Sequence, residues 1–184
     1  MRNTVDPSTP HGYFGTAMRT LYLTRHAKSS WDDPNTDDFH RPLNDRGLRD
    51  APAMARAFKE RGEVVDRLVS SNAVRAITTA KEFAKALAVK EGDIVQDRGI
   101  YLAPAEMLLR TVNLLNNDWQ RVMMFGHNPG FTELAEYISD ADIGELATCA
   151  TVRIDFTVND WAEVSMGLGT LVWHDYPKRH PQLK

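Results

Sequence analysis

Short apolar segments alternate with stretches of helical periodicity along this sequence, and this alternation constrains the fold more than any other feature. Strands are expected near residues 20–24, 67–70, 93–97 and 121–125, and helices near 44–61, 73–88, 104–117 and 129–139. Two further strands, near 151–158 and 170–175, have no helix between them, which predicts an antiparallel pair. The pattern predicts an α/β protein, a three-layer sandwich whose mainly parallel sheet contains at least one antiparallel strand.

The start of the first helix has two interpretations. Asn44 can cap a helix that is kinked at Pro52, or Asp50 can cap a shorter helix that starts near that proline. Gly62 ends the helix in either case.

Three of the predicted strands end next to a basic or imidazole side chain. Arg25 and His26 follow the first strand, and Arg75 lies in the first turn of the helix after the second, away from the apolar face of that helix. His127 follows the strand at 121–125, and Asn128 is expected to cap the next helix, with a proline in its first turn.

The carboxyl ends of parallel strands share one edge of the sheet, where ligands bind in open α/β folds. We therefore expect His26, Arg75 and His127 to converge there although they are far apart in the sequence. A neutral imidazole can attack phosphorus, and a guanidinium group can hold two phosphoryl oxygens through paired hydrogen bonds. The convergence predicts phosphoryl chemistry.

Several motifs in this chain resemble those of the histidine phosphatase superfamily, and within it the SixA-type phosphohistidine phosphatases. They are Arg25-His26-Ala27, the run from Ser70 to Ala80, Gly126 to Gly130, and Arg41-Pro42-Leu43, and the likeness extends from about residue 19 to the end. The resemblance implies a phosphoglycerate mutase-like fold and a phosphohistidine intermediate on His26. It also implies phosphate clamping by Arg25 and Arg75, transition-state support from His127, and a further phosphate contact from Arg41.

One position departs from the family pattern. Leu102 stands where many relatives have the glutamate of a Leu-Tyr-Glu-Ala motif, and phosphomonoesterases of the superfamily use a carboxylate to protonate the leaving group. Four acidic residues are candidates for that role by location only: Glu133, Asp32, Asp33 and Glu106. Imidazole needs such a proton less than an alkoxide does, so the departure favours phosphohistidine over alkyl phosphates.

The leading interpretation is therefore a phosphohistidine phosphatase acting on a phosphorylated protein. Relatives that enclose small sugars usually carry large insertions over the site, whereas only 51 residues lie between Arg75 and His127 here. A phosphatase of small phosphorylated molecules and a non-catalytic phosphate-binding module remain as alternatives.

Composition excludes several other classes of protein. The chain has 184 residues and a formal charge of −3, with no basic run, which argues against nucleic-acid binding. No apolar stretch approaches the roughly 20 residues of a membrane span. The single cysteine, Cys149, excludes an intramolecular disulfide and favours a cytoplasmic location, and we expect it to be buried. Residues 1–17 are expected to form a flexible tail, and residues 18–184 a single domain.

No metal or other cofactor is expected, because the six histidines do not show the spacing of metal ligands. Residues 28–43 form the longest polar connection, and such loops are often functional. Its charged side chains, Asp38 among them, are expected to form a solvated surface, with Arg41 as the exception.

Overall fold

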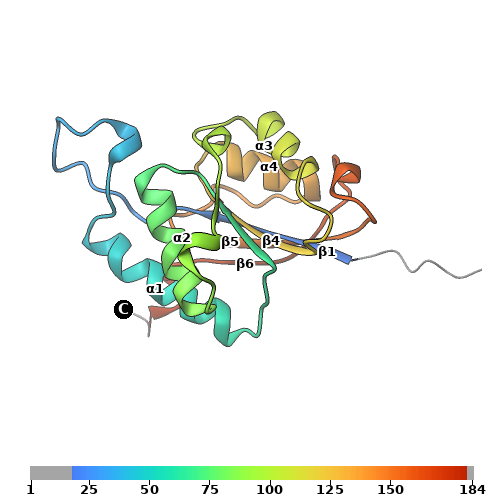
Figure 1. Ribbon diagram of the computed structural model, residues 1–184, viewed down its shortest axis with the longest axis horizontal. Helices are drawn as coiled ribbons and strands as arrows, with labels where there is room; N and C mark the ends of the chain where they lie inside the picture. Colours follow the sequence, from blue (N-terminus) through green and yellow to red (C-terminus); the bar gives the residue numbers. More distant parts are fainter. Residues whose placement is uncertain (1–17, 182–184) are drawn as a thin grey trace, which may run out of the picture.

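Six strands form one mixed sheet in the computed structural model, which describes residues 18–181 (Figure 1). They are β1 (Met18–Arg25), β2 (Arg67–Ser70), β3 (Val95–Gln96), β4 (Arg121–Gly126), β5 (Thr151–Thr157) and β6 (Thr170–Asp175). Across the sheet their order is β3-β2-β4-β1-β5-β6. The first four in that order are parallel, whereas β5 runs antiparallel to both β1 and β6. The predicted α/β class and the antiparallel pair near the C-terminus are confirmed.

Four α-helices cover the two faces of this sheet. Figure 1 shows α1 (Asp45–Glu60) and α2 (Val74–Ala86) on one side, and α3 (Ala105–Asn113) and α4 (Gly130–Ser139) on the other. Short 3-10 helices occur at Asp38–His40, Glu91–Asp93, Arg98–Ile100, Trp161–Glu163 and Pro177–Arg179. The expected three-layer sandwich is therefore present.

The strands alternate their side chains between two apolar cores. In β1, Leu21 and Leu23 pack with residues of α3 and α4, whereas Tyr22 packs with residues of α1 and α2. Successive side chains of a strand point to opposite faces, so a strand covered on both faces is apolar throughout. This explains why the central strands appear in the sequence as continuous apolar runs.

The start of α1 agrees with the first of its two interpretations. The side chain of Asn44 accepts a hydrogen bond from the backbone N–H of Gly47 at 2.9 Å, and the helix continues through Pro52. Asp50 lies inside the helix and does not cap it.

Two other helix boundaries were predicted wrongly. The third helix ends at Asn113 instead of 117, because the side chains of Asn116 and Asn117 accept hydrogen bonds from the backbone N–H groups of Asp118 and Trp161. Asn128 does not cap α4. Its side chain donates to the carbonyl of Leu146 at 3.0 Å, and the cap position is taken by Pro129 without a side-chain bond.

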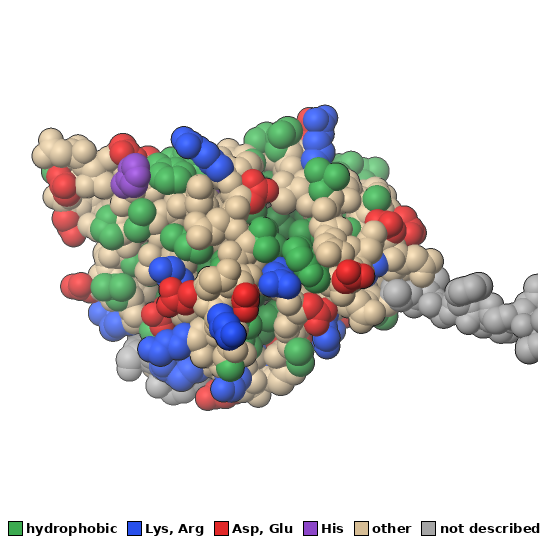
Figure 2. Space-filling view, in the orientation of Figure 1, with side chains coloured by type: hydrophobic (Ala, Val, Ile, Leu, Met, Phe, Trp, Pro, Cys, Tyr) green, Lys and Arg blue, Asp and Glu red, His purple; other side chains and the backbone are tan. Residues whose placement is uncertain are grey.

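The expected tail at residues 1–17 lies outside the described residues. Cys149 is fully buried, as predicted, and burial raises the pKa of its thiol. None of the helices within residues 18–181 is both long and apolar enough to cross a membrane. On the face shown in Figure 2, basic and acidic side chains are interspersed with hydrophobic ones.

Candidate active site

The carboxyl ends of β1, β2 and β4 meet at one edge of the sheet. Arg25 pairs in register with Gly126, and Ser70 pairs with Phe125, so the residues that follow each strand are neighbours. A Cβ atom at Gly126 would lie 2.3 Å from the ring of Phe131, so the glycine lets α4 pack directly on the end of β4. The structure thus brings His26, Arg75 and His127 together, as expected from the sequence.

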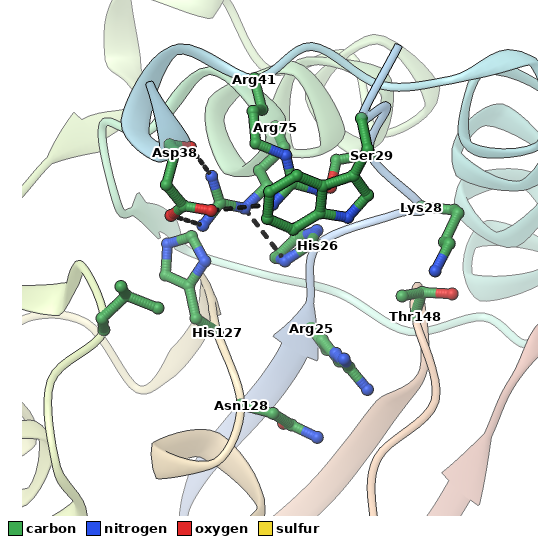
Figure 3. A pocket seen from close by; sticks show the side chains of 12 residues that line it. Arg25, His26, Lys28, Ser29, Asp38, Arg41, Arg75, His127, Asn128 and Thr148 are labelled. Atoms are coloured by element: carbon green, nitrogen blue, oxygen red, sulfur yellow. Dashed lines mark hydrogen bonds and ion pairs between the residues drawn. The ribbon is translucent and has the colours of Figure 1, made fainter. Parts of the chain in front are cut away.

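His26 presents one ring nitrogen to this meeting point (Figure 3). Its Nδ1 lies 2.7 Å from the carbonyl oxygen of Ala27, which can only accept, so Nδ1 carries the proton. Nε2 then accepts a hydrogen bond from Nε of Arg75 at 3.2 Å. Burial, together with the positive charges of Arg75 and Arg25, lowers the pKa of His26 to about 3. The ring is therefore neutral at physiological pH, with its lone pair on Nε2.

Arg75 lies in the first turn of α2 and is 3% exposed. The apolar side chains of this helix, such as Ala80 and Phe83, pack in the core, and Arg75 faces the strand ends instead. One of its terminal nitrogens donates to the carboxylate of Asp38 at 2.8 Å, and the other donates to the backbone carbonyl of the same residue. The guanidinium plane is thereby fixed against His26.

Asp38 corrects the prediction that the charges of the 28–43 loop, apart from Arg41, form a solvated surface. Its carboxylate accepts hydrogen bonds from Arg41 at 2.8 Å, Arg75 at 2.8 Å and the Tyr101 hydroxyl at 2.6 Å. Partial burial acts to raise the pKa of Asp38, but these three hydrogen bonds outweigh it and hold that pKa well below its usual range. Asp38 is therefore an ionised member of the site.

Arg41 also lines the site, but all three of its guanidinium nitrogens have protein acceptors. They donate to the carbonyl of Ser30 at 2.8 Å, to the hydroxyl of Ser29 at 2.6 Å and to Asp38. Its guanidinium carbon lies 3.2 Å from the centre of the Trp31 ring. Arg41 thus braces Asp38, and its expected contact with phosphate stays a prediction.

Arg25 reaches the site from the end of β1. One terminal nitrogen lies 3.0 Å from a carboxylate oxygen of Glu145 and also donates to the carbonyl of Leu146. Its Nε is buried and has no hydrogen-bond partner among residues 18–181. This guanidinium therefore keeps one donor that no described residue uses.

His127 lies beside His26, with 5.1 Å between the centres of the two rings. Its Nε2 is 2.9 Å from the hydroxyl of Ser71, and its ring packs edge-on against Tyr101. Burial, together with the neighbouring His26 and Arg75, lowers the pKa of His127 to about 3. This ring, like that of His26, is neutral at physiological pH.

These residues surround a pocket of about 280 Å³ (Figure 3). Its lining consists of Arg25, His26, Lys28, Ser29, Trp31, Asp38, Arg41, Arg75, Leu102, His127, Asn128 and Thr148. None of the four acidic candidates for proton donation, Glu133, Asp32, Asp33 and Glu106, is among them. Asp38 is the only carboxylate in this lining, and sequence reasoning missed it because its partners come from distant segments.

The charges of the pocket suit a bound oxyanion. Four of the side chains that line it are Lys or Arg, against one carboxylate. Within residues 18–181 there is no group of three or more His, Cys, Asp or Glu side chains that could hold a metal ion. Arginines fix the geometry of a phosphoryl group through paired hydrogen bonds, and a strand-to-helix corner adds backbone N–H groups.

Comparisons with known proteins identify relatives of this chain. The family model described as histidine phosphatase superfamily (branch 1) matches residues 21–99. An uncharacterized chloroplastic protein of Arabidopsis thaliana is 32% identical over 158 residues, which cover 79% of this chain and 70% of the relative. An uncharacterized protein of Mycobacterium tuberculosis is 23% identical over 163 residues, covering 84% of this chain and 99% of the relative.

Solved structures share the fold. A SixA protein of Agrobacterium tumefaciens superimposes with a TM-score of 0.72 at 26% identity, over 86% of this chain and 98% of that one. The protein histidine phosphatase SixA in complex with tungstate gives a TM-score of 0.74 at 20% identity, over 87% and 98% of the two chains. The family model and these relatives show that the chain belongs to the histidine phosphatase superfamily.

Proposed function

We propose that this protein is a metal-independent phosphohistidine phosphatase that forms a covalent phosphohistidine intermediate on His26. The observation that carries the proposal is the fixed tautomer of His26. Its Nδ1–H is held by the carbonyl of Ala27, which leaves the lone pair of Nε2 directed toward the pocket and Arg75. Because the pKa of His26 is lowered to about 3, Nε2 is unprotonated at neutral pH and needs no separate base, and its lone pair is freed for attack when the hydrogen bond from Arg75 breaks.

In the first step, Nε2 of His26 attacks phosphorus, and the bond from phosphorus to the leaving group breaks with its electron pair passing to that group. Arg25 and Arg75 hold the phosphoryl oxygens, and their positive charge stabilises the charge that builds up in the transition state. In the second step, water attacks the phosphorus on His26. The P–N bond then breaks, its electron pair returns to Nε2, and the proton of the water leaves with the phosphate or to solvent.

The leaving group decides which phosphorylated compounds can react. An alkoxide must be protonated as it leaves, and that requires an acid in the pocket. Asp38 is the only carboxylate among the described lining residues, and its low pKa keeps it ionised, so it cannot donate a proton at neutral pH. The imidazole of phosphohistidine needs no such donor once its other ring nitrogen carries a proton, because it then leaves as neutral imidazole. This supports phosphohistidine over alkyl phosphates.

The rim of the pocket suits a side chain that projects from another protein. Trp31 is 71% exposed and Leu102 is 52% exposed, and both line the pocket. A phosphorylated histidine on a protein surface can enter such an open site without being enclosed. We therefore propose a phosphorylated protein as the physiological substrate.

The test is a comparison of kcat/KM at one pH for a phosphohistidine peptide, phosphoramidate, an aryl phosphate and an alkyl phosphate. We expect the peptide to be hydrolysed best and the alkyl phosphate worst. All activity should be lost in His26→Ala. Preference for a small alkyl ester would favour a phosphatase of small molecules. Binding of tungstate without turnover of any of the four would favour a phosphate-binding module.

A further inference from the structure

Ser71 lies next to His127, at a position that the sheet fixes. It follows the last residue of β2, and its backbone N–H donates to the carbonyl of Phe125 at 2.9 Å, across to the neighbouring strand β4. Ser71 is fully buried, and His127 is 2% exposed. The serine does not line the pocket, so its hydroxyl can act on a bound phosphoryl group only through another residue.

The hydrogen bonds around the Ser71 hydroxyl determine where its proton goes. Its oxygen accepts a hydrogen bond from the backbone N–H of Ala73 at 3.3 Å and lies 2.9 Å from Nε2 of His127. These are its two hydrogen-bond contacts within residues 18–181. A serine hydroxyl has one proton and two lone pairs. Because the amide of Ala73 can only donate, the hydroxyl proton is directed to Nε2 of His127.

A neutral imidazole whose Nε2 accepts a hydrogen bond carries its own proton on Nδ1. Nδ1 of His127 is buried and has no hydrogen-bond partner among the described residues. Figure 3 shows the ring of His127 beside His26, with a ring nitrogen on the side that faces His26. The low pKa of His127, about 3, makes the tautomer important, since a neutral ring has a single N–H to offer.

We infer that Ser71 is a positioning residue, which holds His127 in the Nδ1–H tautomer and turns that N–H toward a phosphoryl oxygen on or next to His26. The opposite tautomer would leave the hydroxyl proton of Ser71 without an acceptor and would direct a lone pair at the incoming oxyanion. Both effects are unfavourable in a buried site. The catalytic consequence rests on the proposed function, whereas the tautomer itself does not.

The decisive measurement is the protonation of the His127 ring nitrogens, read by ¹⁵N NMR on the full chain with labelled histidine. In the wild type, Nδ1 is expected to be the protonated nitrogen and Nε2 the unprotonated one. Ser71→Ala is expected to lose this preference, whereas Ser71→Thr, which keeps a hydroxyl, retains it. Ser70→Ala is the matched control, because Ser70 is equally buried but its hydroxyl donates to the carbonyl of Ser71. A wild-type ring protonated on Nε2 would overturn the inference.

Binding of tungstate, a phosphate-like oxyanion, gives a second measurement. Ser71→Ala is expected to bind tungstate about 10–100-fold more weakly, the range known for residues that orient metal-binding histidines, with Ser71→Thr much less affected. In turnover, the loss is expected mainly in kcat, since the Nδ1–H bond strengthens as charge develops on the phosphoryl oxygens. Wild-type affinity for tungstate in a folded Ser71→Ala variant would contradict the inference.

The two proposals can fail separately. If the wild type hydrolyses none of the phosphorylated compounds, the proposed function fails, but the NMR and tungstate results still decide the role of Ser71. If Ser71→Ala does not fold, Ser71→Cys offers a weaker donor of similar size. The wild-type NMR spectrum alone can then refute the tautomer.

Discussion

Nε of Arg75 lies 3.2 Å from Nε2 of His26, so a fixed guanidinium group meets the nitrogen that would attack phosphorus. The other two nitrogens of Arg75 donate to Asp38, which fixes the orientation of the planar guanidinium group. A phosphoryl group on Nε2 of His26 would therefore form within reach of oriented N–H groups. Such preorganised donors do not have to be rearranged as charge develops in the transition state.

Arg75→Lys is expected to lower kcat/KM for a phosphohistidine peptide by about 10²–10³-fold, the range for loss of one preorganised donor. Lysine keeps the positive charge but loses the planar fork that can bind His26, Asp38 and a phosphoryl group together. Arg110→Lys is the matched control, because Arg110 is an exposed residue of α3 whose one ion pair within the described part of the chain is with Glu106, one helix turn away. Near-normal turnover in Arg75→Lys would mean that Arg75 serves only the structure.

His26 is expected to carry the phosphoryl group between the two chemical steps. Brief incubation with substrate, followed by an alkaline quench, should trap phosphate that is stable in base and labile in acid. His40→Ala should still form this adduct, because His40 is exposed and Asp37 is its only hydrogen-bond partner among residues 18–181. Accumulation of the same adduct in His26→Ala would show that the nucleophile is another residue.

The sequence predicts the strand ends and their basic side chains because these depend on local patterns. Apolar runs, helical periodicity and the parallel order of the first four strands suffice to place His26, Arg75 and His127 at one edge. Their chemical roles stay predictions, as do the single domain at 18–184, the cytoplasmic location and the absence of a metal requirement.

Asp38 could not be placed in this way, because its environment is made by distant segments. Arg75 lies 37 residues away along the chain and Tyr101 lies 63 residues away, and both donate to the same carboxylate. A loop with many charges gives no local pattern that distinguishes the residue that turns inward. The same holds for Ser71, whose contact with His127 spans 56 residues.

Both site histidines are expected to stay neutral at mildly acidic pH. Their pKa values are lowered from 6.5 to about 3, chiefly by burial and then by neighbouring charges. In an NMR titration of the free protein, the ring signals of His26 and His127 should therefore not titrate between pH 8 and 5. A midpoint near 6.5 for either ring would contradict the buried, cation-flanked environment.

The same shifts make stability depend on pH. An unfolded chain takes up a proton on each of these histidines below about pH 6.5, whereas the folded chain does so only near pH 3. The unfolded state therefore binds more protons in this window, and the free energy of unfolding falls as the pH is lowered. Urea unfolding at pH 7 and pH 5 should show this loss, and His127→Gln should show a smaller one.

Activity is expected to survive exhaustive chelation. Positive charge in the pocket comes from Arg25, Arg75 and their basic neighbours, which can stabilise the phosphoryl oxygens as a metal ion would. The measurement is kcat/KM before and after treatment with a chelator. Loss of activity that an added divalent cation restores would contradict the prediction.

Leu102 provides the sharpest test of the leaving-group argument. It lines the pocket and is 52% exposed. The resemblance to the superfamily implies a glutamate at this position in many relatives. We expect the wild type to hydrolyse phosphohistidine and aryl phosphates far better than alkyl phosphates, because only the alkyl esters depend strongly on a proton donor. Leu102→Glu should raise kcat/KM for alkyl phosphates, by up to about the 10²-fold typical of general acid catalysis.

Leu102→Gln is the matched control for that substitution, because it has nearly the same shape but no acidic proton. It should leave the preference of the wild type unchanged. Each kcat/KM has to be measured at one pH, since a carboxyl group donates a proton only in its protonated form. Equal rates for alkyl and aryl phosphates in the wild type would mean that another carboxylate, Glu133 being the first to examine, already protonates the leaving group. Because Glu133 is exposed and does not line the pocket, it would have to reach the site through a rearrangement of α4 or a bridging water.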